Sequence, residues 1–94
     1  MSYANEVAAD RRLNILKALA ETTGFGANAT LIGLFLASIG HDVSHDLLQG
    51  ELSWLAEQGF IDIEGDVSRL TRRGADIAAG RASHPGVRRL MPGE

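Results

Sequence analysis

Apolar residues recur with the period of an α-helix in the N-terminal two thirds of the chain. A first amphipathic helix is predicted over residues 5–23, and its buried stripe holds Ala9, Leu13, Leu16 and Ala20. A second helix is predicted from a cap at Asn28 to about Ile39, and it carries almost no charge. One buried stripe needs fewer apolar residues than this, so the second helix is either enclosed on several sides or meets a partner.

A tight turn separates the second predicted helix from a third. Gly40 ends the second helix, and Ser44 can cap the third after the turn residues His-Asp-Val. Gly59 provides a left-handed stop for the third helix. The core stripe of this helix holds Leu48, Leu52 and Leu55. Two helices joined by a short turn that contains glycine are typical of a helix-turn-helix.

The segment after Gly59 alternates between apolar and polar residues, which predicts a β-hairpin. Gly65 and Asp66 suit its two-residue turn. The predicted register pairs Ile61 with Leu70, Asp62 with Arg69, Ile63 with Ser68, and Glu64 with Val67. One face of the hairpin is then apolar and the other carries an Asp-Arg pair. Thr71 can cap a short fourth helix, which Gly80 ends.

These elements, in this order, predict a winged helix-turn-helix domain over residues 1–80, mainly α-helical with a two-stranded wing. The wing tip is only Gly-Asp, which leaves little to reach along a minor groove. Residues 81–94 hold two prolines, two glycines and no apolar period. We therefore expect them to form a flexible basic C-terminal tail.

Three stretches carry a family resemblance: ADRRLNILKALAE near the start, IGHDVSHDLLQGELSWLAEQGFI in the middle, and LTRRGADIAAGRASHPGVRR near the end. Over nearly its whole length the chain resembles the small winged-helix proteins encoded in Mu-like prophages. The combination of LAEQGFI, a hairpin and LTRRG is common to many winged-helix regulators. The resemblance implies a phage-related protein of this fold in a bacterial host, and it implies no particular activity.

The charges are distributed unevenly along the chain. The net charge is −3, but no lysine or arginine occurs between Lys17 and Arg69. Residues 1–66 hold three basic and ten acidic side chains, whereas residues 67–94 hold six basic and two acidic ones. A winged helix usually holds a duplex by neutralising phosphates, so an anionic partner is expected to meet the C-terminal third.

Several kinds of chemistry lack support in the sequence. It has no paired-carboxylate motif with local context, no Gly-rich phosphate loop and no nucleophile elbow. Cysteine is absent, and His41, His45 and His84 make a weak case for a metal site, since a turn separates the first two. We therefore expect no metal, no cofactor and no enzymatic activity. The longest apolar run is too short to span a bilayer and the first residues lack a signal-peptide pattern, so a cytoplasmic location is expected.

Candidate contacts to DNA fall into two groups. His45, Gln49 and Ser53 share the outward face of the third predicted helix, where Gln49 could contact adenine bidentately. The other candidates are phosphate-binding cations of the hairpin, the fourth helix and the tail: Arg69, Arg72, Arg73, Arg88 and Arg89. For this helix face, a plain solvated surface is favoured over a DNA contact, because Asp42, Asp46 and Glu51 would repel phosphates close to it.

Two functions from different classes remain open. In the first, a homodimer associates weakly with duplex DNA as a regulatory module, with the third helix near the major groove and the arginines on phosphates. In the second, the domain is a protein-interaction or dimerisation module, and its apolar surfaces join another phage protein or a second copy. The fold favours DNA association, and the missing basic residues favour the interaction module. Of the two, the sequence predicts weak DNA association, with the interaction module as the alternative.

Overall fold

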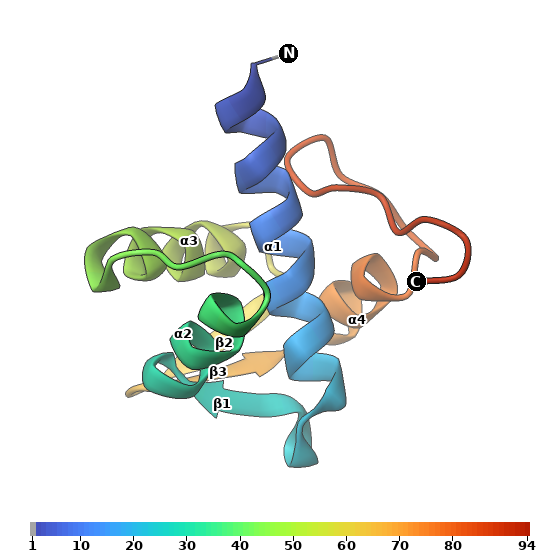
Figure 1. Ribbon diagram of the computed structural model, residues 1–94. Coiled ribbons are helices and arrows are strands. Elements are labelled where there is room, and N and C mark those ends of the chain that lie inside the picture. Colours follow the sequence, from blue (N-terminus) through green and yellow to red (C-terminus); the bar gives the residue numbers. More distant parts are fainter. Residues whose placement is uncertain (1) are drawn as a thin grey trace.

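The computed structural model describes residues 2–94, which form helices packed around a small sheet (Figure 1). The helices are α1 (Tyr3–Glu21), α2 (Ala29–Ser38), α3 (His45–Glu57) and α4 (Arg72–Ala78), with a 3-10 turn η1 (Thr23–Phe25). The strands are β1 (Gly26–Asn28), β2 (Ile61–Glu64) and β3 (Val67–Leu70). The described chain is therefore mainly helical, with one antiparallel sheet.

Local side-chain caps begin α2, α3 and α4 at the predicted positions. The side chains of Asn28, Ser44 and Thr71 accept backbone N–H bonds at the starts of α2, α3 and α4. Ser2 does the same for α1 through the N–H of Asn5, which is why α1 begins two residues before the predicted start. The predicted positions of the second, third and fourth helices are confirmed.

The sheet has the strand order β1-β3-β2, and both neighbours pair antiparallel. The predicted hairpin register is confirmed for all four pairs, from Ile61 opposite Leu70 to Glu64 opposite Val67. Strand β1 was not predicted. Its three residues lie in the connection expected between the first and second helices, and they carry no alternating pattern. β1 forms because the outer edge of β3 offers free backbone groups to it.

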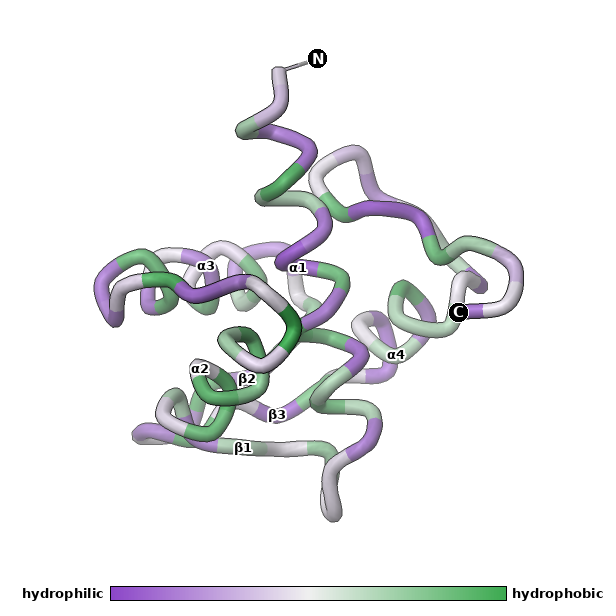
Figure 2. The backbone as a smooth tube through the Cα atoms, viewed as in Figure 1, coloured by the Kyte–Doolittle hydropathy of each residue, from purple (hydrophilic) through white to green (hydrophobic). Residues whose placement is uncertain are grey.

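The core lies between α1 and the other elements. Leu13, Ile15, Leu16 and Leu19 of α1 are fully buried, and α1 contacts α2, α4 and the sheet. Figure 2 shows hydrophobic residues along the inner side of α1 and almost throughout α2. Helix α2 is thus apolar on more than one side. Ile32 and Leu36 bury one side in the core, and another apolar side is exposed.

Residues 81–94 differ from the flexible tail that the sequence predicts. They run back along α1 and return beside α4 (Figure 1). The N–H of Arg88 donates to the carbonyl of Ala9 in α1 at 3.0 Å, Val87 is buried, and Leu90 packs on the core. The segment has no apolar period because it is an extended loop held at separate anchors.

An aromatic cluster holds the middle of this C-terminal segment. The rings of Trp54, Phe60 and His84 meet edge to face, with centroids 5.3 to 6.4 Å apart. Gly86 passes so close to the indole that a Cβ there would lie 2.7 Å from a ring carbon of Trp54. Trp54 thus positions the segment against the end of α3.

Candidate functional site

The outward face of α3 brings together the three residues that the sequence assigned to it. His45, Gln49 and Ser53 are all exposed, and the amide nitrogen of Gln49 lies 3.5 Å from Nε2 of His45. The helix is fixed at its start by Ser44, whose side chain accepts the N–H of Leu47. These polar side chains could hydrogen-bond to a partner, but they bring no permanent positive charge.

Exposed carboxylates surround this face of α3 and follow the hairpin. They belong to Asp42, Asp46, Glu57, Asp62, Glu64 and Asp66. Between residues 18 and 70 the only basic side chain is that of Arg69. A phosphate backbone that approached α3 and the hairpin together would therefore meet a negatively charged surface.

Glu51 does not contribute to this surface, contrary to the expectation that it would repel phosphates there. It is 6% exposed, and its carboxylate accepts bonds from Nη1 of Arg11 at 2.7 Å and from Nε of Arg12 at 3.0 Å. The guanidinium of Arg12 also donates to the carbonyl of Gly86 and lies 4.2 Å from the ring centre of Trp54. Both α1 arginines are thus committed to contacts inside the protein.

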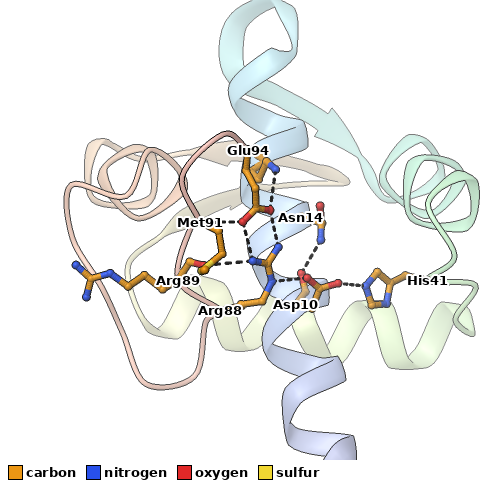
Figure 3. A network of polar contacts seen from close by, with 8 residues as sticks. Asp10, Asn14, His41, Arg88, Arg89, Met91 and Glu94 are labelled. Atoms are coloured by element: carbon orange, nitrogen blue, oxygen red, sulfur yellow. Dashed lines mark hydrogen bonds and ion pairs between the residues drawn. The ribbon is translucent and has the colours of Figure 1, made fainter.

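Arg88, a predicted phosphate contact, lies in another internal network, shown in Figure 3. Its Nε donates to Asp10, and its Nη1 and Nη2 donate to Glu94 at 2.8 and 2.7 Å. Asp10 in turn lies 2.6 Å from Nε2 of His41, in the turn between α2 and α3. The network therefore joins the C-terminal segment, α1 and that turn, and Arg88 is not free to bind a phosphate.

The same contacts change the acidity of the carboxyl groups. Burial alone would raise the pKa of Asp10, but hydrogen bonds from His41 and Arg88 outweigh it, so the pKa lies below its ordinary value. The hydrogen bonds from Arg88 and from the N–H of Met91 lower the pKa of Glu94 to about 2. Bonding to Glu94 and then to Asp10 raises the pKa of Arg88.

Acidification is expected to weaken this network. Both carboxyl groups have a lowered pKa in the folded protein, from 3.8 for Asp10 and from 4.5 for Glu94. Their contribution to stability is therefore complete above pH 4.5 and is lost as the pH falls toward 2. Urea unfolding at pH 6 and pH 3 measures the loss, which Arg88→Gln should reduce and Arg89→Gln should leave unchanged. An Arg88→Gln protein with the full acid loss of the wild type would contradict the assignment.

Three predicted cations remain exposed and make no ion pair within residues 2–94: Arg72, Arg73 and Arg89. Arg73 lies close to Gly59, at the C-terminal end of α3. A helix of 13 residues is about 20 Å long, so Arg73 is far from His45 at the other end. The structure thus does not gather the predicted arginines along the α3 face.

Arg69 makes contacts other than the predicted pair with Asp62. The two residues are opposite in the register, but Nε of Arg69 lies 3.8 Å from the carboxylate of Glu64. Its Nη1 donates to the carbonyl of Gly24 at 3.2 Å. This bond reaches the 3-10 turn because β1, which the sequence did not reveal, places that turn beside β3.

An exposed apolar surface, missed among the predicted site residues, covers the outer side of α2. We call it the α2 face, and we define it as Leu31, Leu34, Phe35 and Ile39 at α2 together with the exposed Phe25 of the 3-10 turn η1. Each of these side chains is between 36% and 63% exposed. Residues 22–40 contain no charged side chain, although the guanidinium of Arg69 reaches this segment at the carbonyl of Gly24, beside Phe25. The nearly charge-free second helix was the sequence signal for it.

A groove runs beside the α2 face, between the end of α1, the 3-10 turn, β1 and α2. It has a volume of about 420 Å³ and is lined mainly by apolar groups. Its walls include Ala18, Leu19, Ala27, Leu31 and Phe35. The α2 face and the groove thus form one continuous apolar region, since Leu31 and Phe35 belong to both.

Within residues 2–94, no helix combines the length and the apolar character needed to cross a membrane. The same part of the chain contains no group of three or more histidine, cysteine or acidic side chains that could hold a metal ion.

Sequence comparison identifies two relatives. The uncharacterized protein gp26 of Escherichia phage Mu is 41% identical over 87 residues, which cover 88% of this chain and 90% of gp26. An uncharacterized protein of Haemophilus influenzae is 44% identical over 64 residues, which cover 68% of this chain and 62% of that protein. No family model and no solved structure matches the chain. The chain therefore belongs to the family of phage Mu gp26, a phage-related family as the resemblance implied.

Proposed function

We propose that this protein is a non-enzymatic winged helix-turn-helix protein that acts in a phage as a protein-association module. The order of three helices, a hairpin and a closing helix supports the winged-helix assignment. The observation that carries the function is the α2 face, a set of large apolar side chains exposed within 19 residues that hold no charge. A second protein surface would cover it.

The size of the α2 face is that of the largest apolar patch on a typical protein surface. Its five side chains expose on the order of 500 Å² of apolar area between them, judging from their exposed fractions. The largest apolar patch of a monomeric protein is commonly of this size, and it is often functional. Exposed at the surface, such a patch favours association because burial of apolar area is favourable.

DNA association is the second candidate, and it is supported by the exposed Arg72, Arg73 and Arg89, which could neutralise phosphates. The polar face formed by His45 and Gln49 could contact bases. The six carboxylates around α3 and the hairpin oppose it. Because they border the surface that a winged helix turns toward a duplex, protein association is the better-supported function.

Photocrosslinking in host cells that carry the phage distinguishes the two functions. A photoreactive residue in place of Leu34, in the α2 face, is expected to form adducts with a polypeptide. The same residue in place of Gln49 or Arg73 is expected to form neither protein nor DNA adducts above background. DNA adducts from Gln49 or Arg73, without protein adducts from Leu34, would overturn the proposal in favour of DNA association.

A further inference from the structure

We infer that the partner of the α2 face is a second copy of this chain, related by a two-fold axis. In this dimer the ring of Phe25 from each copy enters the groove of the other. This inference rests on the proposed function and adds the identity of the partner. Three observations carry it: a projecting aromatic beside an apolar groove, the lack of charged side chains among the residues of the α2 face, and the area available for burial.

Phe25 is shaped as a projection. It is 56% exposed, and its φ angle is 60°, a left-handed conformation that favours glycine over a bulky residue. Thr23 and Gly26 on either side of it line the groove, whereas Phe25 itself does not. The ring therefore stands next to its own groove without filling it. An exposed aromatic side chain held in a strained backbone conformation points to a contact with another molecule.

A projection that lies beside a groove suits a two-fold interface. In a two-fold interface the same patch of both copies meets itself, so each projection faces the region of the other copy's groove. The groove is lined by small and apolar residues, such as Ala18 and Ala27, and its volume of about 420 Å³ leaves room for a phenyl ring. The two insertions are equivalent, so the contact closes with two copies.

The charge distribution suits a second copy better than a charged partner. The chain has a net charge of −3, so two copies repel each other weakly overall. Residues 22–40 contribute no charged side chain of their own, and the charges beside them have opposite signs, because Glu21 lines the groove and Arg69 donates to the carbonyl of Gly24. A partner selected by charge would find no charged side chain among the five residues of the α2 face.

The apolar area of the α2 face matches that of a standard dimer interface. A standard interface buries about 800 Å² per partner, of which about 60% is apolar. That corresponds to about 500 Å² of apolar area per copy, which the five side chains of the α2 face expose. The α2 face therefore holds enough apolar area for one stable two-fold contact.

The mass of the purified protein in solution tests the dimer. Sedimentation equilibrium should give twice the chain mass of 10.0 kDa. Leu34→Glu and Phe25→Asn should each raise the dimer dissociation constant at least 10-fold, because one places charge in the interface and the other removes the ring. Asn tolerates the left-handed conformation, so Phe25→Asn should leave the fold intact, as circular dichroism will show. Leu47→Glu, at a leucine of α3 that is 44% exposed, is the matched control and should stay dimeric.

A monomeric wild type at millimolar concentration would overturn the inference, and so would a dimer that Leu34→Glu leaves unchanged. If the wild type is monomeric while Leu34 forms crosslinks to a different phage polypeptide, the proposed function stands and only the identity of the partner is wrong. If Leu34 forms no crosslinks at all, both fail.

Crosslink mapping tests the insertion of the ring. A benzophenone-bearing phenylalanine in place of Phe25 retains an aromatic side chain, and isotope-labelled and unlabelled copies are mixed to identify intermolecular products. The adducts should map to the groove, within residues 18–35 of the other copy. Adducts that map to α3 or α4 of the other copy would overturn the insertion.

Discussion

Gly74→Ala is expected to lower the melting temperature by about 15 °C or more, which corresponds to about 3 kcal/mol of unfolding free energy. A Cβ at Gly74 would lie 2.0 Å from the carbonyl oxygen of Phe60 and 2.8 Å from Cδ1 of Leu70. That carbonyl also accepts the N–H of Thr71 at 3.1 Å, so it cannot move away without loss of this bond. The substitution therefore forces α4 away from the sheet.

Gly50→Ala is the matched control, since Gly50 is also in a helix but a Cβ there would meet no atom within 4 Å. Alanine has the higher helix propensity, so this variant should gain up to about 1 kcal/mol. Thermal unfolding followed by circular dichroism measures both variants. If the two substitutions changed the melting temperature equally, the close approach of Gly74 to Phe60 would not be what holds α4 against the sheet.

The elements predicted correctly from the sequence depend on contacts between near neighbours. A cap such as Ser44 bonds to an N–H three residues away, so its signal is complete within one turn. The hairpin register follows from alternation and from a two-residue turn at Gly65, which together leave one pairing. Both features could be predicted because no distant part of the chain decides them.

The features that the sequence did not reveal depend on distant partners. β1 has three residues and forms because β3 offers its edge, about 40 residues further along the chain. Residues 81–94 are anchored by contacts to Asp10 and Ala9 that no periodic pattern announces. Because of these contacts, Arg88 is paired inside the protein. Fewer arginines are therefore available to bind phosphate than the charge distribution along the sequence predicts.

The buried pair of Arg11 and Glu51 had a signal that pattern analysis could have used. Arg11 lies four residues before Ile15 and eight before Leu19, so it shares their buried side of α1. Glu51 likewise lies four residues before Leu55 on the buried side of α3. A charged residue on each of two core stripes predicts a pair between them, because an unpaired buried charge is costly.

Glu51→Ala is accordingly expected to lower the unfolding free energy by about 3 kcal/mol. Its carboxylate binds both Arg11, which is 9% exposed, and Arg12, so the change leaves a buried guanidinium without a counter-charge. Urea unfolding at pH 7 measures the loss. Glu57→Ala removes an exposed carboxylate from the same helix and should change the unfolding free energy by less than about 0.5 kcal/mol.

A double variant shows whether the pair itself is needed. Arg11→Leu/Glu51→Leu replaces both buried charges with apolar side chains and should recover most of the stability lost in Glu51→Ala. Recovery would mean that apolar contacts can replace the ion pair in the packing of α1 on α3. If Glu51→Ala instead lowered the unfolding free energy by less than about 1 kcal/mol, the charged guanidinium of Arg11 would not need Glu51 as its counter-charge. The basic residues of α1 would then count again as candidates for phosphate binding, and the case for protein association would weaken.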